Sequence, residues 1–416
     1  MEEIKTYKLE DISVGKGCYG IAASAIPYSH NKRTYLRITD INDDGSINLS
    51  GLMSVEDENA DKFLLNPNDI VFARTGNSTG RSYFYDGSVG PLVYAGFLIK
   101  FSLDKTKVNP RILKYYTHSQ KYYDWVHSFD TGGTRGNINA KTYGEMPIDL
   151  PPIETQNRIV SILKSLDDKI ELNKRINDNL ELQAQALYKS WFVDFEPFKD
   201  GKFVDSELGM IPEGWSIGDI GTYSKVRSGF AFKSSWWTQS GSKVIKIKNI
   251  TSDYRLDMTE CSFVSKDNTA KASEFRVEVG DLLIAMTGAT IGKFCLITSS
   301  DNNTYVNQRV GKFFLGNEPL KRLPFLYCCL KQDSVINEII NKGQGSAQPN
   351  ISGTDIESIK IVLPNDETIP IFNEHLYPMY KMIIKNQEEI ELLSTMRDSI
   401  LPKLMSGELK VNDLNN

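Results

Sequence analysis

The chain has 416 residues, 40% of them hydrophobic and 10% aromatic, which is enough for two or three globular domains with ordinary cores. The formal net charge of −5 excludes a uniformly basic surface, so any contact with a polyanion must come from local patches. Five cysteines and four histidines show no zinc-binding spacing, and no run of about 18 apolar residues occurs, so we expect a reducing, cytoplasmic protein with no metal and no membrane partner.

An internal repeat organises the chain. The segment NDIVFARTGNSTGR (68–81) matches GDLLIAMTGATIGK (280–293) at an offset of 212 positions. Downstream, GNINAKTYGEMPIDLP (136–151) matches PNISGTDIESIKIVLP (349–364) at an offset of 213. Upstream matches at offsets of 208 and 209 join YKLEDI (7–12) to WSIGDI (215–220) and YLRITDI (35–41) to VIKIKNI (244–250). The chain is therefore one unit used twice.

Each copy begins with short β-rich segments separated by Gly, Asn and Asp, such as DIVFA (69–73) and DLLIAM (281–286). One helical stretch is expected within each copy, at 109–129 and at 319–342, before a long terminal helix. The predicted fold class is α+β. Its domains are a β-rich domain at 1–152, a long helix at 153–195, a linker with the second β-rich domain at 196–364, and a final helix and tail at 365–416.

The two long helices have matching apolar seams with alternating steps of four and three residues, which is typical of a coiled coil. Both seams keep the offset of 213, and they comprise Ile159, Leu163, Leu166, Ile170, Asn173, Asn177, Leu180, Ala184 and Leu187, then Phe372, Leu376, Met379, Ile383, Asn386, Ile390, Leu393, Arg397 and Ile400. We expect an antiparallel coiled coil between them, related by a pseudo-two-fold axis. If the helices are centred on each other, Asn173 meets Asn386 and fixes the register. In the alternative, each helix packs on its own domain and these asparagines are solvated.

The stretch TGATIGK (287–293) resembles a phosphate-binding loop in its glycines and lysine. A Walker A loop needs four residues between its glycine and the GK pair, followed by Ser or Thr. Here three residues separate Gly288 from Gly292, and Phe294 follows Lys293. No HExxH motif occurs, and an amino-methyltransferase loop is absent as well. These observations favour binding over catalysis, with no catalytic residue and no bound cofactor.

Three segments carry a family resemblance. LPPIETQNRIVSILKSLDDKIELNKRINDNLELQAQALYKSWFVDF (150–195), SELGMIPEGW (206–215) and GSAQPNISGTDIESIKIVLP (345–364) make the chain resemble the specificity (S) subunit of type I restriction-modification systems. The resemblance implies two target-recognition domains, each reading half of a bipartite double-stranded DNA site. It implies that the paired helices separate these domains and dock two methyltransferase (M) subunits, with restriction (R) subunits completing the host-defence complex. DNA methylation, AdoMet, ATP and Mg would then belong to the partners, and this chain would not be an enzyme.

Reading DNA requires Arg or Lys for guanine, Asn or Gln for adenine, and cations for phosphates. The candidates are Arg74, Asn77, Arg81 and Arg135 in the first domain, and Arg227, Lys233, Lys293, Gln308, Gln344 and Gln348 in the second. Each charge has the alternative of being solvated or locally paired, and the glycines of both TG-x-x-x-G segments have the alternative of serving a tight turn between strands. The Trp236–Trp237 pair is either a DNA contact or part of the core.

Two other functions stay open. One is a structural adaptor, in which two lobes on a coiled coil hold protein partners and never touch DNA. The other is an enzyme, which requires that TGATIGK bind a nucleotide. The sequence does not determine the DNA target, its spacer length, or whether the system restricts or only methylates.

Overall fold

The computed structural model describes residues 4–130, 136–344, 349–364, 367–406 and 408–409. The chain divides into two compact units, each considered by itself: unit 1 comprises Met1–Asp168 and Leu393–Asn416, and unit 2 comprises Lys169–Leu392. Within the described ranges, every helix is too short or too polar to cross a bilayer. This division cuts through both long helices, so the four sequence domains predicted above stay a prediction.

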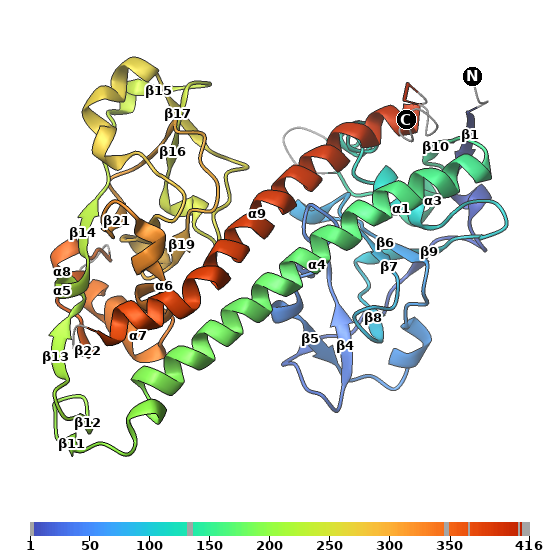
Figure 1. Ribbon diagram of the computed structural model, residues 1–416. Helices are drawn as coiled ribbons and strands as arrows, with labels where there is room; N and C mark the ends of the chain where they lie inside the picture. The colour runs from blue at the N-terminus through green and yellow to red at the C-terminus, as the bar shows by residue number, and fades with distance from the viewer. Residues whose placement is uncertain (1–3, 131–135, 345–348, 365–366, 407, 410–416) are drawn as a thin grey trace. The chain divides into compact units, whose positions relative to one another are not determined.

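Unit 1 is built from small sheets and short helices. Its strands are β1 Lys5–Lys8, β2 Cys18–Tyr19, β3 Ala25–Ile26, β4 Arg33–Leu36, β5 Met53–Val55, β6 Asp69–Ala73, β7 Ser82–Tyr85, β8 Leu92–Tyr94, β9 Leu98–Ser102 and β10 Pro147–Leu150, and its helices include α1 Arg111–Tyr116, α2 Gln120–His127 and α3 Ala140–Gly144. One four-stranded sheet has the order β2-β9-β6-β7, a second has the order β3-β5-β4-β8, and β1 pairs with β10 (Figure 1). The central strand β6 has the sequence DIVFA and is buried at every position, because Ile70 and Phe72 pack in one hydrophobic cluster and Val71 and Ala73 pack in another.

Unit 2 repeats the three sheets of unit 1 and adds one two-stranded sheet. Its strands are β11 Phe203–Val204, β12 Ile211–Pro212, β13 Ser216–Asp219, β14 Lys225–Ser228, β15 Trp237–Thr238, β16 Ser242–Ile245, β17 Ser262–Val264, β18 Leu282–Ala285, β19 Phe294–Leu296, β20 Thr304–Val306, β21 Val310–Phe314 and β22 Lys360–Leu363, and its helices include α5 Ile220–Tyr223, α6 Pro319–Leu330, α7 Asp333–Gly343 and α8 Gly353–Glu357. The sheet orders are β14-β21-β18-β19 and β15-β17-β16-β20, while β13 pairs with β22 and β11 with β12. The repeat found in the sequence is therefore a repeat of the fold.

Short 3-10 helices connect these strands in both units. They are η1 Leu9–Ile12, η2 Ile38–Asp40, η3 Leu49–Gly51, η4 Ala60–Phe63, η5 Gly76–Ser78, η6 Glu196–Phe198, η7 Ser234–Trp236, η8 Ile247–Asn249, η9 Lys266–Asn268, η10 Ala270–Phe275 and η11 Gly288–Thr290. A buried ion pair repeats as well. The Lys100 ammonium lies 3.3 Å from Asp69 in unit 1, and the Lys312 ammonium lies 2.5 Å from Asp281 in unit 2. Both pairs join equivalent central strands at the offset of 212.

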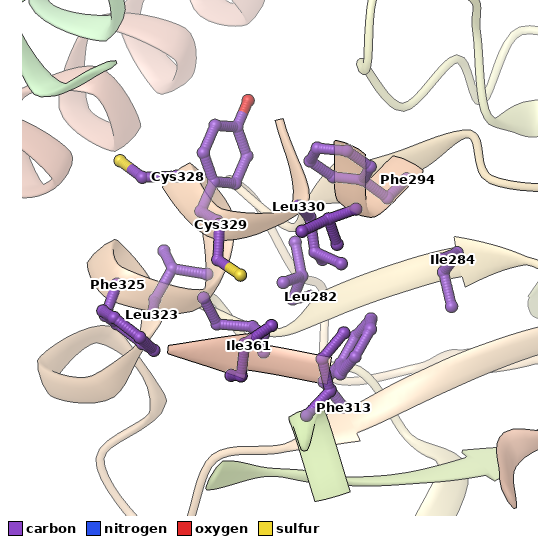
Figure 2. Packing of buried hydrophobic residues seen from close by; sticks show 14 of the residues in the cluster. Leu282, Ile284, Phe294, Phe313, Leu323, Phe325, Cys328, Cys329, Leu330 and Ile361 are labelled. Atoms are coloured by element: carbon purple, nitrogen blue, oxygen red, sulfur yellow. The ribbon is translucent and has the colours of Figure 1, made fainter. Parts of the chain in front are cut away.

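The main core of unit 2 lies between the β18–β21 sheet and α6 (Figure 2). Phe294, Phe313 and Leu282 come from the sheet, and Cys328 and Cys329 come from α6. Burial raises the pKa of the Cys328 thiol to about 12 and that of Cys329 to about 11. Both thiols are therefore neutral core side chains, and all five cysteines are free.

The single helix predicted inside each copy is wrong, because each stretch forms two helices. In unit 1 the break follows α1, where the Ser119 hydroxyl accepts a hydrogen bond from the Tyr122 amide and caps α2. In unit 2 the break falls between α6 and α7, at Lys331 and Gln332. A local side-chain cap overrides the helical apolar spacing in the first of these places.

The two long helices are α4 Ile153–Phe192 and α9 Thr368–Ser406. All nine predicted seam positions of each helix are buried or half-buried. Within unit 2 the helices run side by side in opposite directions, since Phe192 near the end of α4 packs on Phe372 near the start of α9, with ring centroids 4.9 Å apart. The Asn177 amide, further back along α4, contacts the carbonyl oxygen of Ile383, further on along α9.

The predicted contact between Asn173 and Asn386 does not form. The Asn386 amide donates instead to the Asn177 side-chain oxygen at 2.8 Å, and the Asn173 amide donates to Glu389 at 2.8 Å. The stagger differs from a centred pairing by about one helical turn. The prediction ignored the aromatic packing around Phe372, which contributes to the alignment of the helices in unit 2. Asn173 and Asn177 are buried, so the alternative of a solvated Asn173 is also wrong.

Candidate nucleic-acid interface

The TGATIGK segment of unit 2 forms a tight turn. It contains η11 and connects β18 to β19. Four of its backbone amides donate hydrogen bonds to carbonyl oxygens: Gly288 to Pro349 at 2.9 Å, Ile291 to Gly288 at 3.2 Å, Gly292 to Ala285 at 3.2 Å and Lys293 to Thr290 at 3.0 Å. Gly288 and Gly292 have positive φ angles of +68° and +85°, which favour glycine. These four amides are therefore engaged within the turn and do not point freely at a nucleotide phosphate.

Unit 1 forms the same turn around η5. Gly76 and Gly80 have φ angles of +70° and +88°, and a Cβ on Gly80 would lie 2.5 Å from the Val126 side chain. The Gly80 amide donates to Ala73 at 3.0 Å, as Gly292 does to Ala285. The glycines of both segments therefore serve a turn between strands, which is the alternative stated above.

Three backbone hydrogen bonds define a shared frame around each turn. In unit 1 the Ala95 amide donates to the Leu36 carbonyl oxygen at 2.9 Å, the Arg74 amide to Phe97 at 3.1 Å and the Ala73 amide to Arg81 at 2.8 Å. In unit 2 the equivalent bonds run from Asn307 to Ile245, from Met286 to Arg309 and from Ala285 to Lys293, at 3.0, 3.0 and 2.7 Å. We call this frame the turn edge: residues 36–37, 73–81 and 95–97 in unit 1, and 245–246, 285–293 and 307–309 in unit 2. Side chains at equivalent positions can be compared directly.

Arg74 has the most constrained position on the turn edge of unit 1. Its guanidinium lies over the Tyr19 ring, 5.0 Å from the centroid. Tyr19 is 42% exposed, and its hydroxyl accepts a hydrogen bond from the Ala140 amide at 3.1 Å. The Arg74 Nε is buried without a hydrogen-bond partner, which is unusual for an arginine. Tyr19 thus orients a half-buried arginine.

Arg81 is an ion-paired residue. Its Nε and Nη2 contact the Asp43 carboxylate at 2.6 and 3.1 Å, and its Nη1 donates to the Ile41 carbonyl oxygen at 3.1 Å. The locally paired alternative therefore describes Arg81. Asn77 lies exposed in η5, and Arg135 lies outside the described residues.

In unit 2, several predicted residues gather at the turn edge. Lys293 is half-buried, and within the described part of the chain its ammonium has no ion-pair partner. Gln308 is exposed in the 307–309 segment of the same frame. Gln344 is exposed at the end of α7, and the preceding Gly343 accepts a hydrogen bond from Asn350, which bridges to Thr287 in the turn. Gln348 lies outside the described residues.

The aromatic segment of unit 2 lies next to Gln308. The Gln308 amide donates to the Phe230 carbonyl oxygen at 3.0 Å, and the Phe230 ring stacks on Trp236 at an interplanar angle of 9°. The Lys233 ammonium lies 5.4 Å from the Trp236 centroid. Trp236 and Trp237 are both half-buried, so each belongs partly to the core and partly to the surface.

Arg227 lies on β14 and is exposed. Its guanidinium lies 5.1 Å from the Phe314 ring centroid. A long ion pair of 3.7 Å joins it to exposed Glu274. This pair is solvent-screened and contributes little to stability.

Three side chains of the turn edge and its surroundings were not predicted from the sequence. Tyr19 supports Arg74, and Phe97 is 59% exposed. Lys246 follows β16, with its ammonium 3.6 Å from the Trp237 centroid. Burial and the neighbouring Lys248 lower the pKa of Lys246. Lys246 was detectable from the sequence, because it lies in the VIKIKNI segment at the position that aligns with Arg37 of the first copy.

Among the described residues there is no group of three or more His, Cys, Asp or Glu side chains arranged to hold a metal ion.

The family described as type I restriction modification DNA specificity domain matches this chain twice, over residues 1–182 and 212–395. These two matches cover most of the chain and follow its internal repeat. This chain belongs to the type I restriction-modification DNA specificity family.

Individual specificity subunits are similar to most of the chain. The type I restriction enzyme MjaIX specificity subunit of Methanocaldococcus jannaschii is 27% identical over 333 residues, covering 75% of this chain and 72% of that one. The type I restriction enzyme HindI specificity subunit of Haemophilus influenzae is 23% identical over 404 residues, covering 82% and 86%. The crystal structure of the S subunit from M. genitalium has the same fold, with a TM-score of 0.58, 16% identity and coverage of 97% and 96%.

Proposed function

We propose that this chain is the non-catalytic DNA-reading subunit of a type I restriction-modification complex, and that each unit reads one half of a bipartite target. The observation that carries the proposal is the turn edge, which occurs once in each unit with the same three backbone hydrogen bonds. Polar and cationic side chains surround both copies. Because the side chains differ while the frame is constant, each unit is suited to a different half-site.

Arg74 is the best candidate for a base contact in unit 1. The planar guanidinium of arginine matches the O6 and N7 acceptors of guanine in the major groove. The Tyr19 ring restricts this guanidinium before DNA arrives, which reduces the entropy lost on binding. Met286 occupies the equivalent position in unit 2 and cannot make this contact. The proposal therefore assigns a guanine to the half-site of unit 1.

The long helices are the proposed docking site for two methyltransferase subunits. Exposed apolar side chains on α4 and α9 support this assignment, since such side chains commonly mark protein interfaces. They are Leu172, Leu182, Met382 and Leu392. We assign adenine methylation, AdoMet, ATP and Mg to the methyltransferase and restriction partners. The five free cysteines agree with a cytoplasmic complex.

The two helices are also the proposed spacer, paired as an antiparallel coiled coil. A helix the length of α4, with 40 residues, measures about 60 Å at about 1.5 Å per residue. Deleting seven residues from both helices is then expected to change the spacing between half-sites or abolish assembly. Unchanged spacing in an active complex would refute the spacer role.

Selection from a random duplex library tests the function against the adaptor alternative. The chain is assembled with its methyltransferase partner, and retained duplexes are sequenced. We expect enrichment of two short defined elements separated by a fixed undefined spacer. An assembled complex that retains duplexes without any sequence preference, or retains none, would favour the adaptor.

A further inference from the structure

Three equivalent positions of the turn edge, taken with the carboxylates that pair with them, differ in net charge between the two units. In unit 1 the Arg37 side chain contacts Asp40 at 3.0 and 2.6 Å, and Asp40 is buried. Arg81 is held by Asp43. The third position is Phe97, which has no charge. Each cation of this set is neutralised by its own carboxylate.

Unit 2 has three cations at these positions and lacks both carboxylates. Lys246, Lys293 and Arg309 replace Arg37, Arg81 and Phe97. Asn249 and Ser252 replace Asp40 and Asp43 at the shared offset of 209. Within the described part of the chain, none of the three cations has an ion-pair partner. The net charge of the set is therefore zero in unit 1 and +3 in unit 2.

The replacement of Asp40 by Asn249 removes charge and keeps the fold. In unit 1 the Arg37 amide donates to the Asp40 carboxylate at 2.8 Å. In unit 2 the Lys246 amide donates to the Asn249 side-chain oxygen at 2.9 Å. Both residues thus cap the same 3-10 turn, so the carboxylate is not needed for the backbone. Its absence leaves the Lys246 ammonium with the Trp237 ring in place of a counter-ion.

The three cations of unit 2 lie on adjoining backbone segments. The backbone bond from Asn307 to Ile245 places Lys246 beside the 307–309 segment. The bond from Met286 to Arg309 then joins that segment to the turn that carries Lys293. The lysine ammonium groups and the arginine guanidinium are the groups that neutralise DNA phosphates. Locally paired arginines must first exchange an internal carboxylate for the phosphate.

We propose that the two units bind DNA unequally, and that unit 2 supplies phosphate contacts through Lys246, Lys293 and Arg309 that unit 1 does not make at the equivalent positions. This inference rests on the proposed DNA-reading function. It assigns the larger share of the salt-dependent binding to unit 2. The turn edge of unit 1 contacts DNA instead through Arg74 and exposed Phe97.

The salt dependence of DNA binding by the full chain tests this inference. Binding to a short mixed-sequence duplex is measured by fluorescence anisotropy over a salt series, for the wild type and for Lys246→Gln/Lys293→Gln/Arg309→Gln. The logarithm of the binding constant falls with the logarithm of salt concentration by about 0.9 per phosphate contact. We expect the triple variant to reduce this slope by about 2.7.

Two matched variants in unit 1 complete the design. Arg37→Gln/Asp40→Asn/Arg81→Gln/Asp43→Asn removes both ion pairs without changing net charge, and we expect an unchanged slope. Asp40→Asn/Asp43→Ser gives unit 1 the residues of unit 2, which releases Arg37 and Arg81. We expect this variant to steepen the slope by up to about 1.8. Circular dichroism melts establish that each variant is folded.

Each result has a distinct meaning. If the triple variant leaves the salt slope unchanged, the unequal division is overturned and DNA reading stays intact. The same conclusion follows if removing both unit 1 ion pairs reduces the slope by as much as the triple variant does. If the triple variant does not fold, the Asp40→Asn/Asp43→Ser variant decides the question. An unchanged salt slope in that variant overturns the unequal division. A wild-type chain that binds no duplex, alone or with its methyltransferase partner, overturns both the inference and the proposed function.

Discussion

Asp167 joins three elements of unit 1 and provides a sharp test of its packing. Its carboxylate contacts the Lys114 ammonium at 2.7 Å, the Arg397 guanidinium at 3.1 Å and the Tyr115 hydroxyl at 3.1 Å. The Asp167 side chain is 14% exposed. Asp167 lies on α4, Arg397 on α9, and Lys114 and Tyr115 on α1. One carboxylate therefore holds two cations from different helices.

Substituting Asp167→Asn removes the negative charge and leaves the side-chain shape. Lys114 and Arg397 then lose their shared counter-ion in a partly buried site. Charge-assisted hydrogen bonds contribute about 1.5–3 kcal/mol each, but solvent reaches both cations and screens part of this energy. We expect a loss of about 2–3 kcal/mol in the free energy of unfolding. For a unit of this size, that loss lowers Tm by roughly 4–12 °C.

Thermal unfolding followed by circular dichroism measures this loss, with Asp168→Asn as the control. Asp168 is the next residue and pairs with Lys164 on the exposed face of α4, so we expect a change below about 0.5 kcal/mol. Equal effects of the two substitutions would refute the reasoning.

The same site predicts a pH dependence. Burial alone would raise the pKa of Asp167, but Lys114 and Arg397 offset this effect and hold it below its usual value. A lowered folded-state pKa gives stability that is present above the unfolded pKa of about 3.9 and is lost as the pH falls through the folded value. Asp167→Asn should therefore flatten the acid side of the stability curve. An unchanged acid side would contradict the lowered pKa.

Three further predictions concern the helix pair, the base contact and the docking face. Asn177→Leu should destabilise the chain by about 1–2 kcal/mol, because it leaves the Asn386 amide without its acceptor. Asn177→Leu/Asn386→Leu should restore stability in urea denaturation. A double variant that is less stable than the single variant would contradict this. Arg74→Lys keeps the charge but loses the planar guanidinium. The assembled complex should therefore lose about 1–3 kcal/mol of discrimination between the preferred and the other base pairs at one position of one half-site. An unaltered base preference at every position would exclude the base contact. Leu182→Glu, at a position 70% exposed, should leave the Tm unchanged and reduce methyltransferase co-purification; full co-purification would place docking elsewhere.

The sequence was sufficient to predict the duplication, because segments 68–81 and 280–293 retain the same turn chemistry. Glycines at equivalent positions of both segments have positive φ angles, which only a few residue types adopt readily. Every position that the heptad spacing predicted for the two helix seams is likewise buried or half-buried. These features depend on local backbone geometry and spacing, which a single sequence expresses directly.

The sequence was not sufficient to predict contacts that depend on the tertiary fold. Arg81 and Lys293 occupy matching places, yet only the fold brings Asp43 to Arg81. The stagger that joins Asn386 to Asn177 occurs together with the packing of Phe192 on Phe372, which lies far along the helix. Tyr19 was missed because nothing near it in the sequence indicates that it supports Arg74.

Methylome sequencing is the most direct test of the central claim that the two units read a bipartite DNA target. A host lacking other adenine methyltransferases would express this chain together with its methyltransferase partner. The account predicts methylated adenines in a motif of two defined halves separated by a spacer of fixed length. Active methylation in a single continuous motif, or at adenines without a shared motif, would contradict it.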